Sequence, residues 1–199
     1  MRCKPSPIVI ALVVLACWQM GDGLWIYAKA RLAQYLIADA WQQTLATGHT
    51  MKPWPWADTW PVARLQALDK KIDLYVLAGT NGSALAFGPG HMHGSAYPGT
   101  EGVSIVGGHR DTHFRFLQQL AAGDLLKITT RSGDTSAYRV VDQHIADSTV
   151  APLQVTRDES QLLLITCYPF DALRVGGPLR YVVTAVAEQS SVSTDTVLL

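Results

Sequence analysis

From residue 62 onward the sequence consists of short apolar segments separated by turns. Gly, Pro, Asn and Asp gather in the intervening positions, at 79–82, 88–90, 98–99, 131–134 and 176–178. The segments predict strands at 62–65, 74–77, 84–87, 103–106, 125–129, 138–141, 161–166 and 180–186, and the one exception, 112–120, predicts a short helix. Roughly eight short strands at this spacing are typical of a sandwich or a closed barrel, so we expect a mainly β fold.

The first 28 residues predict a membrane-spanning helix. Residues 8–20 carry no charge, and after Asp22 the apolar character continues through 24–27. About 20 such residues are enough to cross a bilayer as a helix. Basic residues at positions 2 and 4 favour an N-terminus in the cytoplasm, and Trp25 and Tyr27 suit the membrane interface. We therefore expect residues 1–28 to form a cytoplasmic stub and an uncleaved signal-anchor, with the rest of the chain outside the cytoplasm.

Two other interpretations of this segment are a cleaved signal peptide and a lipoprotein modified at Cys17. The first lacks a clean cleavage site of small residues. The second would use Cys17 as the modified residue, but the Leu15 that precedes Ala16 matches a lipoprotein modification site poorly.

Residues 29–61 are expected to link the anchor to the β domain. Residues 28–47 contain no Pro or Gly, and the near-helical spacing of their apolar residues predicts a helical stalk that ends at Gly48. Residues 52–61 (Lys-Pro-Trp-Pro-Trp-Ala-Asp-Thr-Trp-Pro) exclude a regular helix or a central strand. They form either an aromatic binding strip or, as we favour, an extended segment that packs its tryptophans onto the β domain. The Ser/Thr-rich tail, 188–199, predicts disorder.

Charge and cysteine content narrow the function. Lys+Arg and Asp+Glu are equal at 16 each, which does not indicate a nucleic-acid partner. Two of the three cysteines, Cys3 and Cys17, lie in the N-terminal apolar region. Cys167 is thus the one cysteine in the body of the chain, and it predicts a free thiol rather than a disulfide framework.

Cys167 lies at the end of an aliphatic run, 162–165, that a proline stops two residues later. A thiol at a strand end can be partly exposed, as a nucleophile must be. His109 is the candidate base, because it follows a predicted strand and a pair of glycines. An imidazole paired with a thiol favours the thiolate and can protonate a leaving amine. Arg180, which begins the next predicted strand, is the candidate for holding an oxyanion, and Arg174 competes with it on proximity to Cys167.

The motifs around these residues resemble those of sortases. Residues 164–167 (Leu-Ile-Thr-Cys) resemble the sortase cysteine strand, 107–114 (Gly-Gly-His-Arg-Asp-Thr-His-Phe) its histidine segment, and 179–183 (Leu-Arg-Tyr-Val-Val) its arginine strand. The order His, Cys, Arg is also that of the family. The resemblance runs over 62–187, and the Trp/Pro segment with the stretches around 166–170 and 176–183 is most similar to the class GN sortases of proteobacteria.

This resemblance implies an eight-stranded β-barrel catalytic domain at 62–187. It implies that Cys167 attacks the Thr–Gly bond of an LPxTG-like sorting signal, that His109 is acid and base, and that Arg180 holds the substrate and the oxyanion. Thr166 and Arg174 would bind substrate. The partners would be a secreted protein with a C-terminal sorting signal and an amine acceptor, at the inner membrane and facing the periplasm; no cofactor and no metal is expected.

Alternatives to a sortase remain at this stage. An L,D-transpeptidase would require Gly at position 166 and Arg at position 169, where Thr166 and Pro169 stand. A papain-like enzyme has Cys before His in the chain, the reverse of the order here. A non-catalytic, membrane-anchored β-barrel adaptor would leave Cys167 inert. A metal site would use His91 and His93 together with the histidines at 109 and 113, but no acidic pattern supports it.

Overall fold

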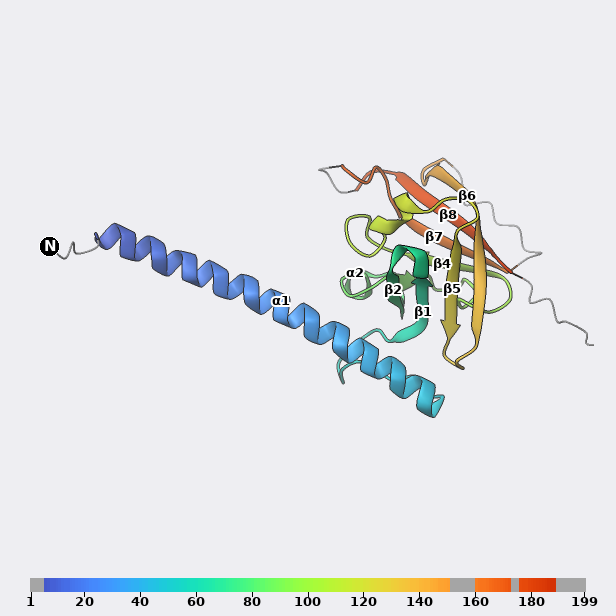
Figure 1. The fold of residues 1–199 in the computed structure, drawn as a ribbon, viewed down its shortest axis with the longest axis horizontal. Coiled ribbons are helices and arrows are strands. Elements are labelled where there is room, and N and C mark those ends of the chain that lie inside the picture. Colours follow the sequence, from blue (N-terminus) through green and yellow to red (C-terminus); the bar gives the residue numbers. More distant parts are fainter. Residues whose placement is uncertain (1–5, 151–159, 173–175, 189–199) are drawn as a thin grey trace, which may run out of the picture.

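The fold is a β-barrel carried on one long helix (Figure 1). The structure is a computed structural model, and it describes residues 6–150, 160–172 and 176–188. The predicted disordered tail, 188–199, lies outside the described residues except for its first member. Figure 1 shows the helix projecting from one side of the barrel, with its N-terminal half extending away from the described strands.

Helix α1 (Pro7–Thr47) joins the predicted anchor and stalk into a single element. Ser6 caps its start through a hydrogen bond from the Ile8 N–H, and Gly48 ends it with φ 72°. The predicted stop at Gly48 is therefore confirmed. Among the described residues α1 is the one helix long and apolar enough to cross a membrane, with a window of mean hydropathy 1.7 that is entirely exposed.

The C-terminal third of α1 packs on the barrel. Ala33, Ile37, Ala40, Trp41 and Thr44 are its buried residues. Ile37 contacts Leu77 and Ala84, and the rings of Trp41 and Tyr75 lie 6.1 Å apart. The helix is therefore held by side-chain packing as well as by its covalent link to the barrel.

Eight strands close into a barrel in the order β1-β2-β3-β4-β7-β8-β6-β5, which confirms the predicted eight-stranded fold. The strands are β1 (Pro61–Ala67), β2 (Ile72–Ala78), β3 (Gly90–His91), β4 (Val103–Gly107), β5 (Leu125–Thr130), β6 (Thr135–Asp147), β7 (Gln161–Cys167) and β8 (Leu179–Ala187). Most neighbours are antiparallel, but β4 and β7 run parallel although more than 50 residues separate them in the chain. Aliphatic and aromatic side chains from all the longer strands fill the interior.

The third strand does not lie where the sequence predicted it. Residues 84–87 were expected to be a strand, but Gly82–Leu85 forms a short helix, α2, whose start is capped by the Asn81 side chain at 3.0 Å from the Ala84 N–H. The strand is instead β3, which lies so close to its neighbour that a Cβ on Gly90 would be 2.0 Å from the Gly79 carbonyl oxygen. The helix predicted at 112–120 is reduced to a 3-10 turn, η2 (Arg115–Gln119); a second 3-10 turn, η1 (Leu68–Lys70), precedes β2.

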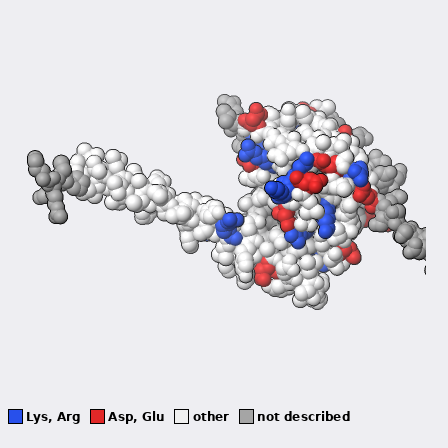
Figure 2. All heavy atoms as spheres, in the orientation of Figure 1, with Lys and Arg blue, Asp and Glu red and all other residues white. Residues whose placement is uncertain are grey.

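The Trp/Pro segment packs only in part. Trp54 contacts Phe87 edge-on at 5.2 Å between ring centroids, and Trp60 packs against the barrel core. Trp56 is 81% exposed. Figure 2 shows basic and acidic side chains intermingled on the face of the barrel in view. One ion pair of the barrel joins Lys70 and Asp124 at 3.1 Å.

Candidate functional site

Cys167 and Arg180 are directly opposite each other on neighbouring strands. Cys167 is the last residue of β7, and the antiparallel register pairs it with Arg180 near the start of β8. Leu164 and Val183, which are also register partners, point into the barrel core. Because successive side chains alternate between the two faces, Cys167 and Arg180 both lie on the outer face. Paired side chains of this kind have Cβ atoms about 5 Å apart.

His109 follows the neighbouring strand on the other side of β7. Gly107 of β4 pairs in parallel with Ile165, and the Gly108 N–H donates to the Ile165 carbonyl at 3.1 Å. His109 therefore leaves β4 at the level at which β7 reaches Cys167. The structure brings His109, Cys167 and Arg180 to one end of three adjacent strands, β4, β7 and β8.

Thr166 links the strands that carry Cys167 and His109. Its hydroxyl donates to the Gly108 carbonyl at 2.7 Å, and the residue is 2% exposed. Because it points inward from β7, it lies on the opposite face from Cys167. The side chain thus holds the backbone next to His109.

The turn after β4 requires a glycine at position 108. A Cβ there would lie 2.7 Å from the ring of Phe114, which is fully buried beneath the turn. The Phe114 N–H in turn donates to the His109 carbonyl at 2.9 Å. This packing folds the loop back on itself and leaves His109 exposed at the rim of the barrel.

The Arg180 guanidinium is anchored to the backbone that precedes β8. Its Nη1 donates to the carbonyls of Gly177 and Leu179, at 2.6 and 2.9 Å. The charge is thereby held near the β7–β8 connection, on the strand residue that pairs with Cys167. Arg174, the other candidate in this loop, lies outside the described residues.

The thiol of Cys167 is free and half-buried. A second histidine lies in the loop after His109: burial, and then the positive charge of His109, hold the pKa of His113 below its usual value, and Asp111 opposes them. The neutral form of His113 is therefore favoured, so that fewer His113 rings carry a second proton to donate.

The histidines at 91 and 93 have separate surroundings. His91 is buried, bonds through Nε2 to the Ala96 carbonyl at 2.9 Å and to the Ser95 hydroxyl at 3.0 Å, and stacks on Tyr97. These contacts shape the β3–β4 loop. Within the part of the chain that the structure describes, no group of three or more His, Cys, Asp or Glu residues is arranged to hold a metal ion.

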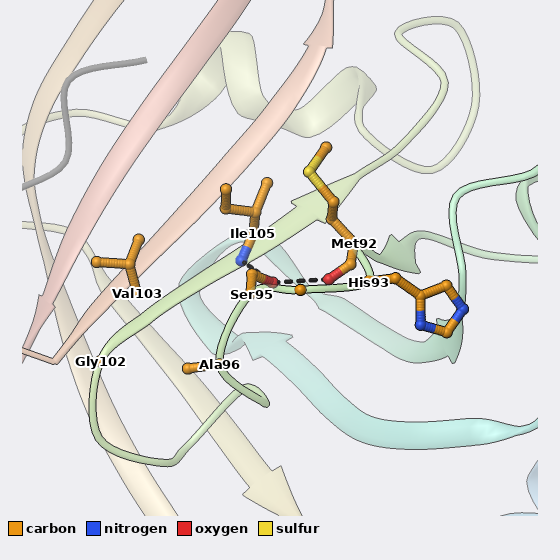
Figure 3. Close-up of a pocket in the computed structure, with 8 residues that line it drawn as sticks. Met92, His93, Ser95, Ala96, Gly102, Val103 and Ile105 are labelled. Atoms are coloured by element: carbon orange, nitrogen blue, oxygen red, sulfur yellow. Dashed lines mark hydrogen bonds between the residues drawn. The ribbon is translucent and has the colours of Figure 1, made fainter. Parts of the chain in front are cut away.

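A pocket of about 530 Å³ lies beside β4 (Figure 3). Its lining comes from residues 92–96 of the β3–β4 loop and from Gly102, Val103 and Ile105. The Ile105 side chain lies on the outer face of β4, as the Cys167 side chain does on β7. Ile105 precedes His109 by four residues, or about 13 Å along a strand. Figure 3 shows Met92 and Ile105 pointing to the same side of the strand.

This pocket was not predicted from the sequence. The available signal was alternation along β4, which places Val103 and Ile105 on the face of Gly107. That signal does not reveal that the β3–β4 loop folds over the strand, where the Ser95 hydroxyl accepts from the Ile105 N–H at 3.1 Å.

A thiol, an imidazole and a guanidinium at the ends of adjacent strands are the groups needed for acyl transfer through a cysteine. The Sortase domain family model matches residues 64–188. Sortase D of Bacillus subtilis (strain 168) is 33% identical over 112 residues, which are 56% of this chain and 56% of the relative, so the match spans about half of that protein.

Solved sortases have the same fold. Sortase A from Corynebacterium diphtheriae matches with a TM-score of 0.57 and 26% identity, over 69% of this chain and 65% of that chain. The Clostridium perfringens sortase D5 transpeptidase matches with a TM-score of 0.63 and 20% identity, over 80% of this chain and 99% of that chain. At that identity the second likeness concerns the fold alone.

Proposed function

Since the chain belongs to the sortase family, we propose that it is a cysteine transpeptidase that cleaves an LPxTG-like sorting signal between Thr and Gly. The observation that carries the proposal is the strand register: Cys167 pairs with Arg180, and Gly107, two residues before His109, pairs with Ile165. This register supports the proposal because it brings three chemically complementary residues to the same end of adjacent strands.

In the first half of the reaction, the Cys167 Sγ attacks the threonine carbonyl carbon. The thiol proton is transferred to His109, and the Arg180 guanidinium stabilises the negative charge that develops on the carbonyl oxygen. Collapse of the tetrahedral intermediate breaks the Thr–Gly bond, and His109 donates its proton to the departing glycine amine. The product is a thioacyl-enzyme.

In the second half, an amine acceptor attacks the thioester carbonyl. His109 takes a proton from the attacking amine, and the Cys167 thiolate leaves as the new amide bond forms. Water in place of the amine yields a free carboxylate. Thr166 supports the geometry through its bond to Gly108, and we assign the binding of peptide near the leaving group to the loop that contains Arg174.

We assign the pocket beside β4 to an apolar side chain upstream of the cleaved bond. In an LPxTG-like signal the leucine precedes the threonine by three residues, or about 10 Å in an extended peptide. The pocket begins about 13 Å along β4 from His109, a comparable distance. Its apolar residues, Met92, Val103 and Ile105, suit an aliphatic side chain.

We further propose that α1 anchors the enzyme in the inner membrane, with residues 62–187 in the periplasm and a secreted protein as substrate. The length and apolar character of residues 8–27 support the anchor. Residues 29–61 would link this anchor to the barrel. Assignment to class GN of the proteobacterial sortases is supported by the Trp/Pro segment and by the residues that surround Cys167 and Arg180.

The test uses the full chain in detergent micelles or nanodiscs with a panel of LPxTG-like peptides. Wild-type protein should form a thioester adduct visible by intact mass and should release the glycine-containing fragment. Cys167→Ala should abolish both, whereas Cys17→Ala, which removes an exposed thiol of α1, should leave both intact. Unchanged cleavage by Cys167→Ala would refute the thiol mechanism, and a folded wild type that forms no adduct with any peptide would favour the adaptor interpretation.

A further inference from the structure

Arg110, the residue directly after His109, is buried. It is 8% exposed and is the one Lys, Arg, Asp or Glu residue among the buried residues that the structure describes. Removing a guanidinium from water is costly unless its donors are satisfied. A charged residue in this position therefore points to specific contacts.

Those contacts reach the loop that follows the nucleophile. The Arg110 Nη2 donates to the Ala172 carbonyl at 2.8 Å, across 62 residues of sequence. Ala172 lies five residues after Cys167, at the end of a turn in which the Ala172 N–H donates to the Pro169 carbonyl. Arg110 makes at least one further interaction besides this bond.

We propose that Arg110 is a positioning residue that sets the placement of His109 relative to Cys167 by tying the histidine loop to the β7–β8 loop. The inference rests on the proposed roles of His109 and Cys167. His109 is then held on both sides: Gly108 before it accepts from Thr166 of β7, and Arg110 after it donates to Ala172. Both ties lead to the segment that carries the nucleophile.

An arginine suits this task better than other residues. Its planar group offers five donors in a fixed arrangement, so that it can hold backbone carbonyls without competing as an acceptor. Lysine would retain the charge but would lose the planar geometry, and methionine would retain only the apolar stem.

The test compares Arg110→Met, Arg110→Lys and a matched control, Arg115→Met, which removes an exposed arginine from the same loop. The readouts for the full chain in micelles are kcat and KM with a cleaved sorting peptide, the thermal midpoint, and the pH dependence of Cys167 alkylation by iodoacetamide. The Cys17→Ala background, with Cys3 also replaced, keeps the alkylation signal specific.

Arg110→Met should lower kcat at least tenfold with KM within about twofold of wild type, and it should move the alkylation midpoint to higher pH because the imidazole no longer lies beside the thiolate. For Arg110→Lys, kcat and the alkylation midpoint should lie between those of Arg110→Met and wild type, and Arg115→Met should match wild type in both. A loss of kcat without a change in the alkylation midpoint would overturn the positioning role, as would a change confined to KM.

Two further outcomes separate the hypotheses. If Arg110→Met does not fold, Arg110→Lys decides, and wild-type kcat and alkylation in that variant overturn the inference. If wild-type Cys167 alkylates like an ordinary thiol and Cys167→Ala still turns over peptide, the proposed function itself has failed, independently of Arg110.

Discussion

Replacing Thr166 by valine tests how the site is held together. Valine has nearly the shape of threonine but removes the hydroxyl that donates to Gly108 at 2.7 Å. At 2% exposure, water cannot reach the position readily to replace the lost donor. Removing one partner of a buried hydrogen bond costs about 1–3 kcal/mol. For a domain of this size, at roughly 3–4 °C per kcal/mol, the thermal midpoint should fall by about 3–12 °C.

The effect of Thr166→Val on turnover should exceed its effect on binding. The lost bond holds the residue immediately before His109, and a misplacement of about 1 Å at a catalytic group costs up to about 100-fold in rate. We expect kcat to fall by about 10-fold to 100-fold, with a smaller change in KM. Steady-state cleavage of a sorting peptide and a thermal melt of the same preparation measure both effects.

Thr166→Ser is the matched control, because it keeps the hydroxyl and loses only a methyl group. It should retain most of the stability and turnover of wild type. If Thr166→Val melted at the wild-type temperature and raised only KM, the hydroxyl would be contacting peptide instead of Gly108, and the reasoning would be wrong.

Four further outcomes follow from other parts of the structure. Ile105→Ala should lower kcat/KM for a peptide with an apolar upstream residue by about tenfold, while Cys167 alkylation stays unchanged, as stopped-flow and mass measurements would show. Trp41→Ala should lower the free energy of unfolding by about 3–5 kcal/mol in denaturant titrations, whereas Tyr35→Ala, on the exposed side of α1, should change it by less than about 0.5 kcal/mol. Ser104→Ala should keep or raise the thermal midpoint, because the Ser104 hydroxyl is buried and has no hydrogen-bond partner among the described residues. Burial holds the pKa of His113 below its value in an unfolded chain, so the neutral ring stabilises the fold above about pH 6.5, and this contribution is lost as the pH falls through the lowered pKa. As the pH falls from about 7 to about 5, unfolding titrations should therefore show a steeper loss of stability in wild type than in His113→Gln. Equal slopes in the two proteins would contradict this role of His113.

The neighbourhood of Cys167 and Arg180 could be predicted from local sequence. Both lie at the ends of strongly apolar runs joined by a loop rich in Gly and Pro, and consecutive strands of this kind commonly pair. The approach of His109 to this end of β7 is different, because it depends on the parallel pairing of β4 and β7 across more than 50 residues. Hydrophobic periodicity contains no information about that pairing, and the family resemblance implied only that His109 acts together with Cys167.

The strand that was predicted wrongly at 84–87 and the strand that was missed, β3, both have local causes. Residues 84–87 are as apolar as a strand, but the cap at Asn81 and the packing of Ala84 against α1 favour a helical turn. β3 has two residues, Gly90 and His91, and is too short to show any alternation. Arg110 was visible in the sequence next to His109, but its burial and its bond to Ala172 depend on the approach of two loops that no local pattern encodes.

The continuity of α1 constrains how the proposed membrane-bound enzyme meets its substrate. Ala33, the first buried residue of α1, follows Tyr27 at the end of the apolar segment by six positions, or about 9 Å of helix. The Gln34 side chain then donates to the Phe87 carbonyl at 2.7 Å, and Trp41 packs on Tyr75. A helix packed in this way cannot act as a flexible tether, so its direction sets the orientation of the barrel. In Figure 1 the carboxyl end of β7, where Cys167 lies, is on the side of the barrel that faces the N-terminal half of α1. With that half in a bilayer, Cys167 would face the membrane from which a substrate's sorting signal, followed by an apolar C-terminal segment, emerges.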